Sequence, residues 1–519
     1  MMLSKKKIAW YALILLLTIN TAFAGPWILP GNLSVKSDID LLADAGLIKA
    51  PVMTWPIAWV SIGPQLSSPE TKTKLAKEPE SVKQAYQRIL ILYKENYQPH
   101  HLQTSVYASG AQKLNPFRTF EYEPYADFAT GAAFAYQANH FADSVNMSYY
   151  EAPNRSYSNY AHVDNSYAYL LLGNWAIGFD QVNRWWGPGY SDSLILSQNA
   201  EPIPTFTIQR MKAEAFQTKW LHWIGPWSLT SSLSSQFDGG SISNTNALIW
   251  LTNIAFRPII SLQFSLSQVS LFAGDARPLS WAKVQNLVTL QGYCYDGKGN
   301  GNTPCQDEPG KNHVETSALW SLDPVFSIPV DLYVQFAFDD AASISHSWGN
   351  HLTIPAKPIF LGGIDWINNF NAGRLKTYFE YENSQVYNYP FFTGGTYPNA
   401  FNFYGGSTNY PYTYYGSNMG SSLGDEAIAE TLGFILNEND GNSDTAMLRY
   451  LDVNLYGGVG VGYPFQPQHL IWGSVGRNFL LSRRFGFLSA ELGYLQSIKG
   501  SGLNSGLSAM LTWSKRLDF

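Results

Sequence analysis

Apolar and polar side chains alternate along the last part of the chain. Over residues 503–519 the odd-numbered positions are mostly apolar and the even-numbered positions are mostly polar. Because successive side chains of a β-strand point to opposite faces, this pattern predicts a strand with one apolar and one polar face. A strand of this kind that ends in an aromatic residue, here Phe519, is typical of the last strand of an outer-membrane β-barrel, whose outer face contacts lipid.

The same alternation recurs in earlier parts of the chain. Over residues 331–339 the even positions are apolar, and over residues 375–382 the charged side chains share one face. The apolar residues between positions 167 and 179 are also expected to share a single face. Charged residues on the inner face predict a polar lumen that is filled with water or closed by hydrogen bonds.

We therefore expect residues 101–519 to form an all-β transmembrane outer-membrane barrel of antiparallel strands. A strand of about 10 residues with its connection takes roughly 20 to 25 residues, which predicts about 16 to 20 strands. A soluble sandwich or propeller would also alternate, but no repeat of fixed period is evident. The expected partners of the barrel are outer-membrane lipid and, through the strand that ends in Phe519, the barrel-assembly machinery; we expect a monomer.

The first 24 residues have the features of a cleaved signal peptide. Residues 5–7 are lysines, residues 8–19 are almost wholly apolar, and residues 22–24 have the small-x-small pattern of a cleavage site. The apolar stretch is shorter than the roughly 20 residues that a membrane-spanning helix needs. Residues 1–24 are therefore predicted to be removed during export.

Residues 25–100 have a helical pattern, unlike the rest of the chain. Ser37 is placed to cap a helix over residues 38–45, Ser68 with Pro69 to open a second helix, and Pro79 to open a third. Apolar residues of the third helix recur at spacings of three and four, which indicates an amphipathic helix. We expect a small helical bundle that packs on another part of the protein.

Composition narrows the range of functions. Charged residues make up 14% of the chain and aromatic residues 15%, whereas soluble domains contain about 25% charged residues. A net charge of −6 argues against nucleic acid as a partner, because phosphate binding requires clustered positive charge. The sequence contains no metal-ligand box, phosphate loop or dinucleotide fingerprint, so neither a metal nor a cofactor is expected.

The only two cysteines, Cys294 and Cys305, flank a segment rich in Gly and Asn. In an exported protein, two cysteines this close together in a loop predict a disulfide. A metal site would need more thiols or histidines nearby, and only His313 is close.

The densest motif lies between residues 173 and 202. It contains the run WWGPG at residues 185–189, the run SLILS at residues 193–197, and Asn199-Ala200 shortly before a proline. This segment resembles the capsule-assembly outer-membrane protein family known as Wzi. The resemblance implies a barrel of about eighteen strands with a small N-terminal α-helical bundle on the periplasmic side. It also implies a lectin that holds capsular or exported polysaccharide at the cell surface, and not an enzyme.

Four residues of this segment, Asp180, Arg184, Trp185 and Trp186, have the chemistry that sugar binding needs. Aromatic faces stack on sugar rings, and charged planar groups form bidentate hydrogen bonds. The alternative is structural: Arg184 pairs with Asp180 inside the barrel, and the tryptophans fill the lumen or pack at an interface. The structural interpretation is favoured, because lumen charges usually pair and aromatic residues usually gather at the membrane interfaces.

A second candidate site is the aromatic tract over residues 387–415, which is interleaved with Gly and Asn. Long loops of outer-membrane barrels lie outside the cell, and a loop rich in Tyr, Gly and Asn resembles an antibody paratope in composition. Alternatively, much of the tract is strand and membrane-interface belt, and the sequence leaves both interpretations open. The candidate ligand-binding residues of the tract are Tyr397, Tyr404, Tyr410, Tyr412 and Tyr415.

Two other functions are alternatives to a lectin. The polar inner face of the strands also suits a diffusion channel for small solutes. Ser345 and His346 suggest the nucleophile pair of a barrel hydrolase, but no nucleophile elbow surrounds them. An enzyme is therefore not expected, and a polysaccharide lectin of the cell outer membrane is preferred to both alternatives.

Overall fold

The computed structural model describes residues 25–153, 161–235, 246–274, 278–289, 294–295, 298–299, 310–345, 351–386, 403–404, 412–455, 466–482, 484–500 and 502–517. The predicted signal peptide, residues 1–24, and the terminal Phe519 lie outside these residues. The signal peptide and the role of Phe519 in barrel assembly therefore stay predictions.

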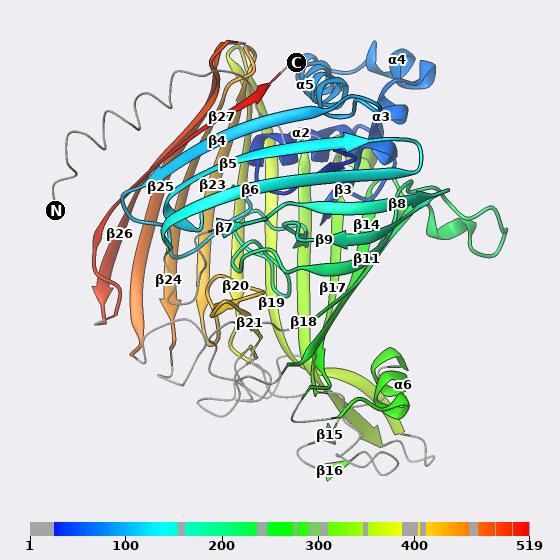
Figure 1. The fold of residues 1–519 in the computed structure, drawn as a ribbon, viewed down its shortest axis with the longest axis vertical. Coiled ribbons are helices and arrows are strands. Elements are labelled where there is room, and N and C mark those ends of the chain that lie inside the picture. Colours follow the sequence, from blue (N-terminus) through cyan, green and yellow to red (C-terminus); the bar gives the residue numbers. More distant parts are fainter. Residues whose placement is uncertain are drawn as a thin grey trace.

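Antiparallel strands form a closed barrel (Figure 1). Its strands are β4 (Gln103–Ala111), β5 (Ala126–Gln137), β6 (Phe141–Pro153), β8 (Tyr167–Leu172), β9 (Trp175–Asp180), β11 (Thr205–Arg210), β12 (Trp227–Ser235), β13 (Leu248–Ile259), β14 (Leu262–Phe272), β17 (Gly310–Ser321), β18 (Val330–Ser345), β19 (His351–Phe370), β20 (Gly373–Asn383), β23 (Ile428–Glu438), β24 (Ser443–Val453), β25 (Gln468–Ser482), β26 (Gly486–Lys499) and β27 (Gly506–Leu517). The two-residue β7 (Ala161–His162) pairs with β6, as β8 does, so the wall has 18 strands. The last strand, β27, pairs with the first, β4. The predicted fold, an antiparallel barrel of about 18 strands, is confirmed.

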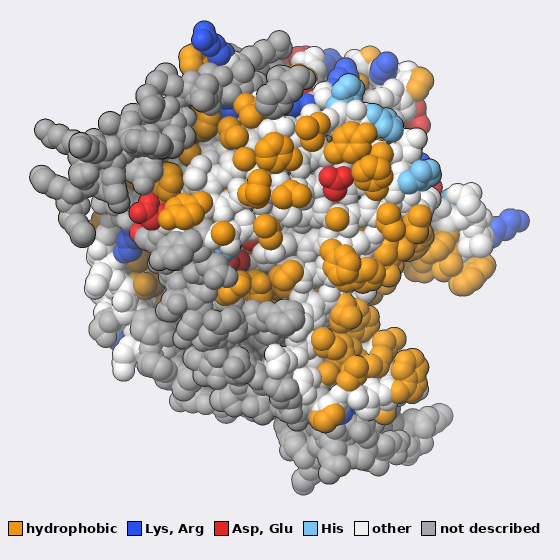
Figure 2. Space-filling model, in the orientation of Figure 1, with side chains coloured by type: hydrophobic (Ala, Val, Ile, Leu, Met, Phe, Trp, Pro, Cys, Tyr) orange, Lys and Arg blue, Asp and Glu red, His pale blue; other side chains and the backbone are white. Residues whose placement is uncertain are grey.

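The predicted alternation between lipid and lumen holds along the wall. On β18, Asp331 and Gln335 are buried, whereas Leu332 between them is exposed. On β27, Leu507 and Leu511 are exposed. Figure 2 shows apolar side chains spread over the outer face of the strands. The outer face of the wall is thus suited to lipid, and the polar residues are directed inward.

The expectation that apolar residues from 167 to 179 share one face is wrong. The turn at residues 173–174 divides this segment into β8 and β9. Directly opposite residues of an antiparallel pair lie on the same face, and Tyr169 is opposite Gly178. Tyr169 is therefore buried, whereas Phe179 is 66% exposed on the outer face.

Among the residues described from position 25 onward, four helices precede the wall: α2 (Leu33–Asp44), α3 (Trp59–Leu66), α4 (Pro69–Leu75) and α5 (Glu80–Asn96). The predicted cap of α4 is confirmed, because the Ser68 side chain accepts a hydrogen bond from the Thr71 amide. The predicted cap at Ser37 is wrong. Asn32 caps α2 instead by accepting from the Val35 amide, and the buried Ser37 accepts from Arg374 of the wall.

The remaining elements are short. They are β1 (Trp27–Ile28), β2 (Thr54–Trp55), β3 (Ile57–Ala58), β10 (Trp185–Trp186), β15 (Cys294–Tyr295), β16 (Lys298–Gly299), β21 (Thr413–Tyr414), β22 (Ser417–Asn418), η1 (His222–Ile224), α6 (Trp281–Thr289) and α7 (Asp323–Phe326). No helix within the described ranges has the length and apolar character needed to cross a membrane.

The helical segment, which comprises α2 to α5, lies at the end of the barrel where the strand connections are short (Figure 1). We call this the short-turn end; its connections include those between β8 and β9 and between β23 and β24. Arg88 of α5 donates to the Glu438 carbonyl at one such turn. Arg257 of β13 donates to the carbonyls of Ala43 and Ile48, just before and after the end of α2. Short turns of outer-membrane barrels usually face the periplasm. The helices thus lie at the end where a periplasmic bundle is expected, and their periplasmic location stays a prediction.

Asp38 fastens α2 to both α5 and the wall. Its carboxylate accepts hydrogen bonds of 2.7 Å from Arg88 and from Arg374, and one of 2.8 Å from Asn437. Burial alone would raise the pKa of Asp38, but the two guanidinium groups hold it below its usual value. The carboxylate is therefore charged, and α2 is held by ion pairs as well as by apolar packing.

Replacing Asp38 tests this attachment. Asp38→Ala leaves the buried Arg374 without its main counter-charge, so we expect a loss of about 3–5 kcal/mol in the free energy of unfolding. Denaturant unfolding of the purified protein in detergent measures the change. Asp440→Ala is the control, because Asp440 lies in an exposed turn and bonds only to Asn442 of that turn. An equal, small effect of both variants would contradict the assigned role.

Candidate functional site

The connection between β9 and β11, residues 181–204, folds into the lumen and is called the inner loop here. Its strand β10 pairs with β2 of the N-terminal segment, with Trp185 opposite Trp55. Phe120 lies between these two indoles, with ring centroids 5.1 Å from Trp55 and 5.3 Å from Trp185. Trp185 and Trp186 are 0% and 1% exposed. The two tryptophans therefore join the inner loop to the N-terminal segment.

Asp180 and Arg184 form an ion pair at the start of the inner loop. The Arg184 guanidinium donates to the Asp180 carboxylate at 2.7 Å and to the hydroxyls of Thr205 and Thr207 at 3.1 Å. Both charged residues are buried. This is the pairing that the structural alternative predicts; whether either residue binds a ligand stays untested.

Glu380 of the wall holds the WWGPG turn region in place. Its carboxylate accepts hydrogen bonds from the backbone amides of Tyr190 and Ser191 at 2.7 and 2.8 Å, and from the Tyr333 hydroxyl at 2.8 Å. These donors satisfy a carboxylate that points into the barrel. Glu380 thus serves as a structural acceptor for the inner loop.

Tyr190 of the inner loop meets charged residues of the wall and of α2. Its hydroxyl accepts a 2.8 Å hydrogen bond from Lys376 and lies 3.0 Å from both Asp40 and Asp365. Lys376 also forms a 3.0 Å ion pair with Asp365. Wall, helix and inner loop are therefore connected through one buried polar network.

A second segment, residues 412–427, covers the inner loop from the other end of the barrel. Asp192 of the inner loop accepts hydrogen bonds from the hydroxyls of Ser421 and Ser422 at 3.0 and 2.7 Å. The hydroxyl of Tyr404 donates to the Leu194 carbonyl at 2.6 Å, and that of Tyr412 donates to Ile195 at 2.5 Å. Burial raises the pKa of Asp192 to about 6 and those of both tyrosines above their usual value.

The aromatic tract is thus partly inside the protein. Tyr404 and Tyr412 are both 0% exposed, whereas Tyr415 is only half-buried and its ring centroid lies 4.6 Å from that of Tyr414. Tyr397 and Tyr410 lie outside the described residues. So do Cys305 and His346, which leaves the disulfide and the proposed Ser345–His346 pair as predictions.

The sequence-based candidates did not include Trp281, the first residue of α6. Helix α6 lies at the opposite end of the barrel from α3, α4 and α5 (Figure 1). We call this the long-loop end. Trp281 begins α6 in the connection between β14 and β17 and is 79% exposed. The signal for this helix in the sequence is Ser280, which directly precedes it. In the structure the Ser280 hydroxyl accepts a 3.3 Å hydrogen bond from the Lys283 amide. An exposed indole at this end can stack on a ligand without any rearrangement.

One group among the described residues has the donor types of a metal site. His162, Asp164 and Glu201 place their ligand atoms within 4.8 Å of one another, and all three are buried. Nδ1 of His162 lies 3.8 Å from Oδ2 of Asp164 and 3.5 Å from Oε2 of Glu201. Sequence spacing could not reveal this group, because Glu201 reaches it through the fold of the inner loop.

Comparison with known proteins identifies relatives of the whole barrel. The family described as capsule assembly protein Wzi matches residues 100–477. A protein of Klebsiella pneumoniae, described as an uncharacterized 55.8 kDa protein in the cps region, is 25% identical over 359 residues. That match covers 69% of this chain and 65% of the relative, so the chain spans just under two thirds of the relative's length.

Similar solved structures were also found. Wzi of Escherichia coli, described as an outer membrane protein involved in group 1 capsule assembly and a carbohydrate binding β-barrel, has a TM-score of 0.75 at 21% identity. The match covers 94% of this chain and 98% of that chain. The outer membrane protein OprD of Pseudomonas aeruginosa matches with a TM-score of only 0.41 at 7% identity, covering 81% and 94% of the two chains.

Glu121 brings a third inward connection, between β4 and β5, against the start of α2. Its carboxyl group accepts hydrogen bonds from the Leu33 amide at 2.8 Å and from the Asn478 amide group at 3.2 Å. Leu33 is the first residue of α2, where a negative charge is favourable. Burial nevertheless dominates and raises the pKa of Glu121 to about 7.

This raised pKa predicts a pH-dependent stability. The folded state binds the proton of Glu121 more tightly than the unfolded state, so its contribution is lost as pH rises from about 4.5 to about 7. Glu121→Gln removes the charge and keeps one acceptor oxygen for the Leu33 amide. It is expected to remove up to about 3 kcal/mol of the decline in unfolding free energy between pH 5 and pH 8. The exposed Glu80→Gln is the matched control. Parallel pH profiles for Glu121→Gln and wild type would contradict the assignment.

Proposed function

The chain belongs to the capsule assembly protein family Wzi, and from this premise we propose that it is a lectin that retains capsular or exported polysaccharide at the cell surface and assists capsule assembly. The protein is an outer-membrane barrel. The proposed ligand follows the description of the Escherichia coli relative as a carbohydrate binding barrel. It also fits the abundance of tyrosine and tryptophan in the sequence.

The filled lumen is the observation that best supports a binding protein. Helix α2, the inner loop and segment 412–427 pack together inside the wall, and buried acids and tyrosines join them. A diffusion channel needs a continuous water-filled path, whereas this arrangement uses the polar inner face for hydrogen bonds within the protein. We therefore place the proposed ligand outside the lumen, on the connections at the long-loop end.

Within this proposal, the predicted ligand-binding residues divide into two groups. The first group is buried and would support the binding surface from inside the barrel. It comprises Asp180, Arg184, Trp185, Trp186, Tyr404 and Tyr412. Tyr415 is half-buried and would contact sugar with Trp281, together with Tyr397 and Tyr410. Aromatic side chains suit this role, because their faces stack on the apolar faces of sugar rings.

Conductance separates the lectin from the channel alternative. We expect the purified protein in planar lipid bilayers to show no steady open state, because three segments of the chain occupy the lumen. A matched recording with an open porin confirms that insertion is efficient. A steady, voltage-independent conductance of the wild-type protein would favour the diffusion channel instead.

Polysaccharide retention tests the proposal in cells. In a strain without the protein, we expect less cell-attached and more released polysaccharide, and the wild-type gene should restore attachment. Trp281→Ala should restore it only in part, with roughly two- to tenfold weaker binding of the purified polysaccharide, because one stacking contact is lost. Trp223→Ala is the matched control: Trp223 is 65% exposed but lies in η1, in the connection between β11 and β12 at the short-turn end. Equal attachment in the deletion and wild-type strains would overturn the proposed function.

A further inference from the structure

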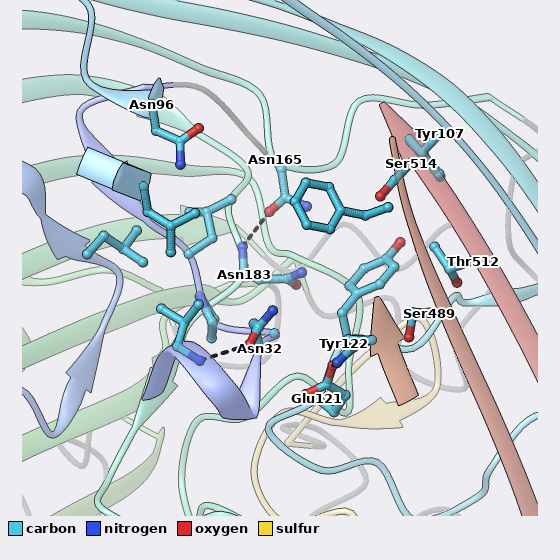
Figure 3. Close-up of a pocket in the computed structure, with 18 of the residues that line it drawn as sticks. Asn32, Asn96, Tyr107, Glu121, Tyr122, Asn165, Asn183, Ser489, Thr512 and Ser514 are labelled. Carbon is cyan, nitrogen blue, oxygen red and sulfur yellow. Dashed lines mark hydrogen bonds between the residues drawn. The ribbon is translucent and has the colours of Figure 1, made fainter. Parts of the chain in front are cut away.

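A cavity of about 300 Å³ lies near the short-turn end of the barrel, where the last strands of the wall meet the helical segment and the inner loop (Figure 3). The N-terminal segment around Trp27 and Asn32 forms one side of it, and Asn96 at the end of α5 contributes to its rim. Ser489 of β26 and Thr512 of β27 line it from the barrel wall. The cavity is therefore a gap between the helical segment and the wall.

The lining combines a larger apolar surface with many uncharged polar groups. The polar groups are mainly amides and hydroxyls, and no lysine or arginine is among the described residues that line the cavity. Its single carboxyl group, that of Glu121, is already engaged by Leu33 and Asn478. Aromatic rings of Trp27, Trp59, Tyr107 and Tyr122 supply part of the apolar lining, and aliphatic side chains such as Ile28 and Leu488 supply the rest. This combination of uncharged donors, acceptors and ring faces matches a polyhydroxylated, uncharged molecule.

Several polar atoms around the cavity have no hydrogen-bond partner among the described protein atoms. These are Nε1 of Trp27, Nε1 of Trp59, Oδ1 of Asn96 and Oγ1 of Thr512. Trp27, Trp59 and Asn96 are only 5%, 2% and 5% exposed. Buried polar groups in native proteins are nearly always satisfied, so two indole donors, an amide oxygen and a hydroxyl around one cavity indicate a bound molecule that offers both donors and acceptors.

The labelled side chains approach the cavity from both sides. In Figure 3 the Asn96 amide lies on one side, and Ser489, Thr512 and Ser514 lie on the other. Asn165 and Asn183 are held in place between them, because the Asn165 side chain accepts a 3.0 Å hydrogen bond from the Asn183 amide. The site is thus built from four separate parts of the fold, and its geometry exists only in the assembled barrel.

We propose that this cavity is a second carbohydrate site, which binds one or two units of a neutral saccharide from the periplasmic end. Its volume is at the lower limit of small-molecule sites, which excludes a polymer and suits a monosaccharide or disaccharide. Sugar hydroxyls donate to Asn96 and Thr512 and accept from the two indoles, and the ring faces pack on the aromatic side chains. The site is separate from the long-loop surface, so it goes beyond polysaccharide retention and does not depend on it.

Binding to the purified full-length protein tests this site. The protein is prepared in a detergent without a sugar head group, and saturation-transfer NMR and calorimetry are used with D-glucose, D-galactose, D-mannose and maltose. At least one of these neutral sugars should bind. D-glucuronate should bind at least tenfold more weakly than the corresponding neutral sugar, because the described lining residues offer no lysine or arginine to pair with its carboxylate.

Two conservative variants locate the binding. Thr512→Val removes the unpartnered hydroxyl, and Asn96→Val removes the amide group that carries the unpartnered oxygen; each should weaken binding about five- to tenfold. Thr252→Val is the matched control, because Thr252 is a half-buried strand residue of β13 that does not line the cavity. Equal heat-modifiable mobility of all variants on electrophoresis shows that each barrel is folded.

Different results would overturn the cavity proposal and the polysaccharide-retention proposal. The cavity proposal is overturned if none of the four neutral sugars binds, if D-glucuronate binds as tightly, or if neither variant changes the affinity of a sugar that binds. Cells that carry Thr512→Val should keep wild-type amounts of attached polysaccharide. Loss of retention with intact sugar binding in Trp281→Ala would identify the two surfaces as independent.

Discussion

The pairing of charges that face the lumen is the constraint on which the rest of this structure depends. Lys376, Glu380 and Arg374 all belong to β20 and are all almost fully buried. Isolated charges in such an environment are costly, and the cost is offset only when each group finds partners of good geometry. Asp365, Tyr190 and Asp38 provide those partners from the neighbouring strand, the inner loop and α2.

This constraint explains why segments far apart in the sequence meet inside the barrel. The wall alone cannot satisfy its inward charges, so α2 and the inner loop enter the lumen and bring complementary groups with them. The Trp185–Trp186 strand and the tyrosines of the aromatic tract then fill the space that remains. The two proposed sites accordingly lie at the two ends: the connections at the long-loop end, and the cavity beside the helical segment at the short-turn end.

Some features could be predicted because they depend on neighbouring residues. Alternation along β18 and β20 showed which side chains face inward, and the Ser68–Pro69 pair marked the start of α4. The cap of α2 could not be assigned correctly, because Ser37 is engaged by Arg374, more than 300 positions later. Tyr167 and Phe179 were assigned to one face because the turn between them was not recognised.

The candidate site shows the same difference between features that depend on neighbouring residues and features that depend on distant ones. The sequence by itself determined the class of protein, the approximate number of strands, the inward direction of the charges and the residue types available for stacking on sugar. Only the tertiary structure decided which aromatic side chains are accessible: Trp185 and Tyr412 are enclosed, and Trp281 is exposed. The physical reason is that alternation is a property of neighbouring residues along a strand, whereas burial depends on distant segments that pack against it. The cavity at the short-turn end follows the same rule, because its unpartnered atoms come from the N-terminal segment, from α3 and α5, and from the last strand of the wall.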